Sequence, residues 1–251
     1  MKTDVLIKYL IYQLYRARLK LSGVSAASDP EELHQFRVAL RRSRSLLQLY
    51  LPKSDAIHDV IKTMFRPTNI LRELDVLLHS LEKNDYPKLY KQLRSYRNRQ
   101  YKLITPDIYI EHNTNLLEKL IDELLTINTA YTDKTLIQKA LKYYKKTNTA
   151  YKALAPDTPP KKLHELRIKF KTARYALELL KENGLSHNDK KIDYAKKKQD
   201  ELGAIQDAHS QLVLLKTFCK TCKLDECRHL YKARKKEYKA LVKTAMSNRS
   251  D

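Results

Sequence analysis

The pattern of apolar positions is helical along almost the whole chain. Apolar residues recur at steps of three and four, the spacing of one buried face of an α-helix. Gly23, Pro52, Pro67, Pro87 and Pro106 interrupt the pattern and divide its first half. The pattern predicts helices over residues 3–21, 29–50, 53–65, 67–81, 86–104, 113–125, 134–154, 161–182, 187–206, 207–221 and 224–246.

Composition agrees with an all-α fold. The 251 residues include only three glycines and no tryptophan, which is typical of helical proteins. The chain also lacks the Gly-rich loops with which other folds wrap phosphate in backbone amides, so lysine, arginine and histidine side chains would have to hold such a ligand. We predict a single domain over residues 1–251, built from two similar halves of about 1–126 and 127–251.

A basic motif, His-x-x-Arg-x-x-x-basic-x-x-Arg, occurs twice. The first copy runs over residues 34–44 and the second over residues 164–174, an offset of 130. The matched pairs are His34 with His164, Arg37 with Arg167, Arg41 with Lys171 and Arg44 with Arg174. Apolar positions repeat at the same offset: Leu33 with Leu163, Phe36 with Leu166 and Leu40 with Phe170.

On a helix, the motif forms one stripe of positive charge beside the apolar face. At about 100° per residue, the four basic positions fall within a sector of roughly 80°, next to the sector that holds Leu33, Phe36, Leu40 and Leu47. A solvated charged face usually lies opposite the core and mixes signs. The stripe is about 15 Å long, which fits several linked phosphates better than a single small anion.

A second pair of segments is weaker evidence of duplication. Residues 69–78 align with residues 203–209 at an offset of 134. Arg72 then corresponds to Gln206, whereas the carboxylate of Glu73 corresponds to that of Asp207. We interpret these acids as groups that orient arginines by ion pairing.

The motifs together resemble the CHAD domain, the conserved histidine α-helical domain, over nearly the whole chain. The resemblance rests on residues 34–44 and 164–179, with 202–207 and 72–77 similar to its secondary motifs. It implies two four-helix bundles related by pseudo-twofold symmetry, with a basic central groove that binds inorganic polyphosphate, and an association of some members with polyphosphate granules. Glu73 stands where aspartate is usual, and Lys171 keeps the charge of Arg41 without its planar fork.

We therefore predict a non-enzymatic polyphosphate-binding protein that needs neither cofactor nor metal. The predicted contacts are His34, Arg37, Arg41, Arg42, Arg44, Arg66, Arg72, His164, Arg167, Lys169, Lys171 and Arg174. The net charge of +21 suits a polyanionic partner. Replacing Arg37, Arg41, Arg167 and Arg174 together is predicted to weaken binding and to leave the thermal midpoint nearly unchanged.

Two alternatives stay open. Nucleic acid could bind through its phosphates, although the stripes lack the aromatic, Asn and Gln side chains that stack on bases or contact their edges. A metal-dependent polyphosphate hydrolase or phosphotransferase would need a cluster of acids or an activated nucleophile, and the sequence shows neither.

The cysteines and the apolar segments bear on location. Cys219, Cys222 and Cys227 lie within nine residues, and free or buried thiols are favoured over a local disulfide or a metal site. The most apolar stretch, residues 5–15, is short and contains Lys8, and no signal-peptide cleavage site is evident. We expect a cytoplasmic protein that does not bind membranes; the oligomeric state is not predicted.

Overall fold

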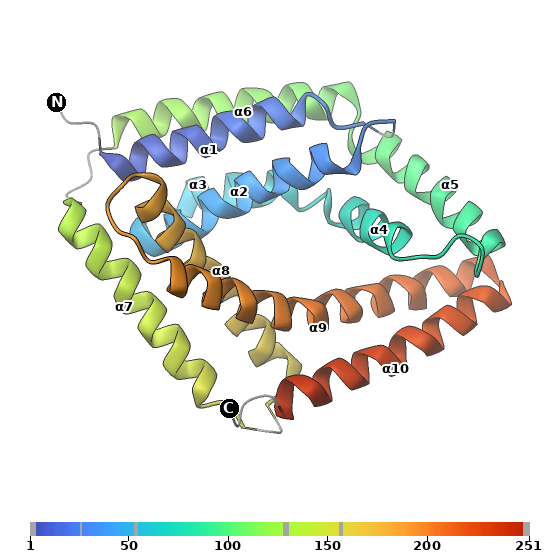
Figure 1. Ribbon diagram of the computed structural model, residues 1–251. Helices are drawn as coiled ribbons and strands as arrows, with labels where there is room; N and C mark the ends of the chain where they lie inside the picture. Colours follow the sequence, from blue (N-terminus) through green and yellow to red (C-terminus); the bar gives the residue numbers. More distant parts are fainter. Residues whose placement is uncertain (1–3, 26, 53–54, 128–130, 156–157, 248–251) are drawn as a thin grey trace. The chain divides into compact units, whose positions relative to one another are not determined.

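The computed structural model describes residues 4–25, 27–52, 55–127, 131–155 and 158–247. Within these ranges the fold is all-α, with ten helices and no strand (Figure 1). The helices are α1 (Val5–Leu21), α2 (Pro30–Tyr50), α3 (Asp55–Phe65), α4 (Asn69–His79), α5 (Pro87–Ile104), α6 (Asp107–Thr126), α7 (Asp133–Lys152), α8 (Pro160–Glu182), α9 (Asp189–Cys222) and α10 (Asp225–Ser247). The predicted helix starts at residues 3 and 53 lie outside the described residues.

Two predicted helix limits were wrong. Residues 187–206 and 207–221 were predicted as separate helices, but α9 continues through both segments. Asp207 is exposed on this helix, so its carboxylate is solvated and does not cap a new helix. Helix α6 begins at Asp107, six residues before the predicted start at 113, because Pro106 and Asp107 provide a helix start that the apolar spacing alone did not reveal.

The chain divides into two compact units, Met1–Ala130 and Tyr131–Asp251. The first contains α1 to α6 and the second α7 to α10. The pseudo-twofold relation of the halves and their common groove stay predictions.

In the first unit, α1 packs against α2 and α6, α2 also contacts α3 and α4, and α4 packs against α5 (Figure 1). The core is made of fully buried side chains that include Leu6, Leu10, Leu14, Phe36, Leu40, Leu71, Leu74, Leu89 and Leu93.

A buried polar network also joins α4 to α5. The Nε–H of Arg97 donates to Asp75 Oδ1 at 2.6 Å, and the hydroxyl of Tyr101 donates to Asp75 Oδ2 at 2.6 Å. Because both oxygens of the carboxylate are used, Asp75 fixes the face that α5 turns inward. Burial and this carboxylate raise the pKa of Tyr101 well above its ordinary value, so the hydroxyl of Tyr101 stays protonated and remains the donor of this hydrogen bond.

In the second unit, α8 packs against α7 and α9, and α9 packs against α10. One hydrophobic cluster holds these helices together, consisting of Tyr151, Leu163, Leu166, Phe170, Ala195, Leu202 and Ile205. The rings of Tyr151 and Phe170 meet edge to face, with their centroids 5.6 Å apart.

Two cysteines do not follow the sequence prediction. Cys219 near the end of α9 and Cys227 near the start of α10 form a disulfide, and Cys222 is free. The preference for thiols is thus wrong for two of the three cysteines. The spacing did not decide this, because it leaves open whether the turn at residues 223–224 brings the two helix ends together. No helix among the described residues has the length and apolar character needed to cross a membrane.

Candidate anion-binding surfaces

Helix α2 carries the first basic motif, and local sequence sets its start. The Glu31 backbone N–H donates to Asp29 Oδ1 at 2.8 Å, and Pro30 occupies the first turn, where a missing N–H costs nothing. Its apolar face is fully buried at Leu33, Phe36, Leu40 and Leu47. On the adjacent sector the side chains of His34, Arg41 and Arg44 are half-buried.

Arg37 is the one member of this motif that is buried, with 6% of its surface exposed. Its Nη1 donates to Phe65 O at 2.9 Å and to Thr68 Oγ1 at 2.6 Å, and its Nη2 donates to Asn69 Oδ1 at 2.7 Å. These bonds tie α2 to the connection between α3 and α4. Most of the guanidinium is therefore already engaged inside the protein.

The charge of Arg37 is held in a poorly solvated position. Burial first, and then the nearby charges of Arg41 and Arg72, lower the pKa of Arg37 to about 9. Arg37 is still a cation at pH 7. The carboxylate of Glu73 acts in the opposite direction, and burial raises the pKa of Glu73 while the charge of Arg37 lowers it.

His34 lies among these same cations. Burial lowers its pKa below the ordinary 6.5, and the charges of Arg72, Arg41 and Arg37 lower it further, opposed by Glu31. Its Nδ1 atom is buried without a hydrogen-bond partner among the described residues. His34 is therefore mainly neutral at pH 7, and an anion placed among the three arginines would favour its protonation.

The side chains of the other arginines of the first unit contact different parts of that unit. The Nε–H of Arg41 donates to the carbonyl of Arg37 at 3.1 Å, and the guanidinium of Arg44 lies 6.0 Å from the ring centroid of Phe65. Arg42 instead points to α1, where its Nη1 donates to Tyr9 Oη at 2.8 Å. Arg66, next to Phe65, is exposed. Arg42 thus supports helix packing.

Helix α8 carries the second motif and also separates core from charge. Leu163, Leu166 and Phe170 are at most 4% exposed. His164 and Arg167 are half-buried, whereas Lys169 is exposed. His164, Arg167 and also Arg174 are therefore the half-buried members of the predicted stripe.

Arg167 lies against α9 at its glycine. A Cβ atom on Gly203 would come within 3.4 Å of Arg167 Nε, so the missing side chain lets the guanidinium rest on the helix backbone. Gly203 is the residue that the sequence aligns with Asn69, and Asn69 contacts Arg37. In each unit the first arginine of the motif therefore meets the corresponding position of a neighbouring helix.

The C-terminal part of the second stripe is engaged within the unit. Arg174 Nη1 donates to Glu178 Oε1 at 2.8 Å, and its Nε donates to Gln199 Oε1 at 3.0 Å. Lys171 is buried, with 9% of its surface exposed. Arg174 is a poorer candidate contact than His164 and Arg167, because an anion would have to compete with Glu178 for it. Lys171 is also a poorer candidate, because it is buried.

A pocket of about 330 Å³ opens beside His164. It is lined by Lys161, Leu163, His164, Leu202, Ile205, Gln206, His209 and Tyr238, from α8, α9 and α10. The rings of His209 and Tyr238 lie 5.8 Å apart. Lys161 and His209 lie outside the basic motif and were not predicted as site residues. Lys161 lies three residues before His164, and His209 three residues after Gln206, so helical spacing offered a signal for each.

The described carboxylates near these cations do not form a cluster that could bind a metal ion. Among the described residues no group of three or more His, Cys, Asp or Glu side chains is placed to hold a metal ion. Glu73 and Glu178 instead lie beside Arg37 and Arg174 respectively.

These features define an all-helical protein with two compact units and clustered cations on a helix of each. The family model of the CHAD domain matches residues 8–216. The chain therefore belongs to the CHAD domain family.

Solved structures share this fold. The CHAD domain from the plant Ricinus communis superposes with a TM-score of 0.70 at 20% sequence identity, over 94% of this chain and 89% of that chain. PptA from Streptomyces chartreusis gives a TM-score of 0.62 at 15% identity, over 98% of each chain. No curated protein matches this chain.

Proposed function

We propose that this chain binds inorganic polyphosphate, without a cofactor and without catalysing a reaction. The observation that supports this most is the cluster of Arg37, Arg41 and Arg72 around His34, where burial and then the charges of these arginines lower the pKa of His34. Such a concentration of like charge raises the free energy of the unliganded protein, and a polyanion relieves it. Membership of the CHAD family is consistent with this ligand.

The proposal divides the predicted residues by role. Those that would contact phosphoryl oxygens are His34, Arg41, Arg44, Arg72, His164 and Arg167, with the exposed Arg66 and Lys169 at the margins. The other group is Arg37, Arg42, Lys171 and Arg174: Arg37 and Lys171 are buried, Arg42 donates to Tyr9, and Arg174 pairs with Glu178. The second group would position the first, and it would also add to the positive potential.

A test of this proposal removes one accessible arginine from each unit. Arg41→Gln combined with Arg167→Gln is expected to weaken polyphosphate binding about 100-fold, because each charge-assisted hydrogen bond contributes about 1.5 kcal/mol or more. Fluorescence anisotropy with labelled polyphosphate would measure this. Lys119→Gln combined with Lys142→Gln removes the same charge from exposed positions on α6 and α7 and is the control.

The proposal is wrong if the stripe variant binds polyphosphate as tightly as the wild type, or if the control variant loses as much affinity. Helicity and the thermal midpoint of each variant should stay close to those of the wild type. The family resemblance also implies an association with polyphosphate granules, and a fluorescent fusion of this chain that avoids such granules would contradict that association.

The enzymatic alternative has its own test. A polyphosphate hydrolase would release orthophosphate in the presence of magnesium or manganese, and Glu73→Gln or Asp207→Asn would abolish that release. We expect no release above background from the wild-type protein. Sustained turnover that depends on either carboxylate would replace the binding proposal.

A further inference from the structure

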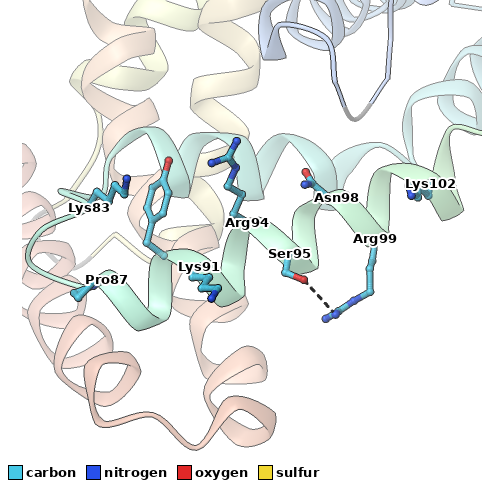
Figure 2. Close-up of a pocket in the computed structure, with 9 residues that line it drawn as sticks. Lys83, Pro87, Lys91, Arg94, Ser95, Asn98, Arg99 and Lys102 are labelled. Carbon is cyan, nitrogen blue, oxygen red and sulfur yellow. Dashed lines mark hydrogen bonds between the residues drawn. The ribbon is translucent and has the colours of Figure 1, made fainter.

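A basic hollow on the first unit lies along α5, and none of the residues that line it belongs to the basic motif (Figure 2). It has a volume of about 530 Å³ and is lined by Lys83, Pro87, Tyr90, Lys91, Arg94, Ser95, Asn98, Arg99 and Lys102. Apart from Lys83, these residues form two neighbouring rows with a spacing of four. One row is residues 90, 94, 98 and 102, and the other is 87, 91, 95 and 99.

The hollow is strongly cationic and contains no acid. Five of its nine lining residues are lysine or arginine, and α5 contains no Asp or Glu. Within the part of the chain that the structure describes, the α5 residue that pairs with a carboxylate is Arg97, which turns inward to Asp75. The cations that line the hollow are exposed. Like charges three or four residues apart destabilise a helix, so a bound polyanion would relieve this repulsion.

Neutral side chains are interleaved with these cations. Tyr90 adds an aromatic ring, and Asn98 and Ser95 add hydrogen-bonding groups. Asn98 Oδ1 accepts from Arg97 Nη1 at 3.3 Å, which orients the amide while its N–H₂ group remains a donor. Ser95 Oγ accepts from Arg99 Nη1 at 3.4 Å (Figure 2). Within the basic motifs of α2 and α8 the aromatic residues, Phe36 and Phe170, are fully buried.

We infer that the α5 hollow binds single-stranded nucleic acid. Lys91, Arg94 and Lys102 would contact the phosphates, and Tyr90 would stack on an unpaired base. A cationic groove with an aromatic platform is the arrangement by which proteins bind single strands without strict sequence preference. Polyphosphate has no base to stack and no base edge for Asn98 to contact, so it would leave the neutral groups of the hollow unused. This inference does not depend on the proposed polyphosphate function.

The test uses labelled oligo(U) and oligo(dT) with the full-length protein at moderate salt. Lys91→Gln combined with Arg94→Gln is expected to weaken binding at least about tenfold and to reduce the slope of log K against log salt by about 0.7 for each lost phosphate contact. The matched control is Lys88→Gln combined with Lys119→Gln, which removes two exposed cations of the first unit that do not line the hollow. It should change affinity little.

Tyr90 provides a second, independent readout. Tyr90→Leu should weaken binding about tenfold, since stacking on one base contributes about 1–3 kcal/mol. The salt slope should stay unchanged, because no phosphate contact is lost. Tyr90→Phe keeps the aromatic face and should restore the affinity. If Tyr90→Phe binds as weakly as Tyr90→Leu, stacking is not the interaction.

Four results would overturn the inference. The wild-type protein could fail to bind either oligonucleotide, or could bind duplex more tightly than single strands. The α5 variant could lose polyphosphate binding as strongly as oligonucleotide binding, which would make the hollow a polyphosphate site. Oligonucleotide binding could instead be lost in the Arg41→Gln, Arg167→Gln variant and kept in the α5 variant. Failure of the polyphosphate proposal is detected separately, by polyphosphate binding to the stripe variant.

Discussion

Arg37 and Arg41 lie one turn apart on the same face of α2 and differ in what surrounds them. Arg37 is buried and bonded to three groups from the α3–α4 connection, whereas Arg41 is half-buried and donates from Nε to the carbonyl of Arg37. In the sequence motif the two arginines are equivalent basic positions. The structure assigns the first mainly to holding the unit together and leaves the second as a candidate ligand contact.

Arg37→Met is therefore expected to lower the free energy of unfolding by about 2 kcal/mol or more, because it removes three hydrogen bonds that a charged donor makes in the interior. Denaturant unfolding would measure the loss. Arg41→Gln is the control and should change stability by well under half of that amount. Equal stability of Arg37→Met and the wild type would show that these bonds contribute little.

This expectation revises the one drawn from sequence for the combined variant. Replacing Arg37 together with Arg41, Arg167 and Arg174 should lower the thermal midpoint as well as weaken binding, because one of the four arginines is part of the interior. A test of binding alone should leave Arg37 intact.

The depressed pKa of His34 predicts that polyphosphate binding takes up a proton. In the free protein the burial of His34 and its three neighbouring arginines disfavour the imidazolium. A bound polyanion offsets those arginines and raises the pKa of His34. The affinity gained from its protonation is present below the free-state pKa and is lost as pH rises through the bound-state pKa. Calorimetry near pH 6.5 in buffers of different ionisation enthalpy would count the protons taken up.

The control for this proton uptake is His187→Gln, which removes an exposed histidine of the second unit. His34→Gln should abolish a large share of the uptake, and His187→Gln should leave it unchanged. The prediction would be wrong if wild-type affinity did not vary between pH 5.5 and 7.5, a window chosen to bracket the ordinary histidine pKa of about 6.5.

At the scale of helices, α9 shows where local patterns mislead. The apolar pattern predicted two helices, over residues 187–206 and 207–221, yet the backbone stays helical from Asp189 to Cys222. Glycine lowers helix stability by about 1 kcal/mol relative to alanine, which packing along the rest of a long helix can offset. The glycine instead gives Arg167 room to lie against the helix.

The disulfide between Cys219 and Cys227 constrains the turn between α9 and α10. It closes a loop over a sequence separation of 8, and loop-closure entropy predicts that it stabilises the second unit by about 2.5 kcal/mol. Cys227→Ser should lower the free energy of unfolding by about that amount. Unfolding in urea with probes in each unit would measure it.

Cys222→Ser is the matched control for this bond, because Cys222 is free. It should leave stability unchanged, and a reductant should destabilise the wild type but have no further effect on Cys227→Ser. An unchanged wild-type stability in reductant would show that the bond contributes nothing. Disulfides are rare in the cytosol of mesophiles and common inside hyperthermophiles, so the cytoplasmic location stays a prediction.

At the scale of the whole molecule, the chain forms two compact units, and the cations on each have different surroundings. The predicted common groove implies a definite number of bound polyphosphate chains per protein. If one long polyphosphate chain contacts both stripes, calorimetry should give one chain per protein, and Arg41→Gln or Arg167→Gln alone should each weaken that single event. Two long chains per protein, with each variant affecting one of them, would contradict the shared groove.

The sequence by itself determined the helical class, most helix positions and the neighbouring core and basic faces of α2 and α8. It could do so because the buried face of a helix repeats at a fixed short spacing, and because a motif and its apolar positions recur at one offset. It also indicated the family, which the match over residues 8–216 confirms.

Only the tertiary structure decided which basic residues remain accessible. Periodicity places Arg37, Arg41 and Arg44 on one face, but the α3–α4 connection that buries Arg37 is supplied by residues about 30 positions away. The same holds for Arg174, whose partner Gln199 lies on α9, and for the turn that joins Cys219 to Cys227. The α5 hollow also depends on packing, because Asp75 on α4 turns Arg97 inward and leaves the other cations of α5 in solvent.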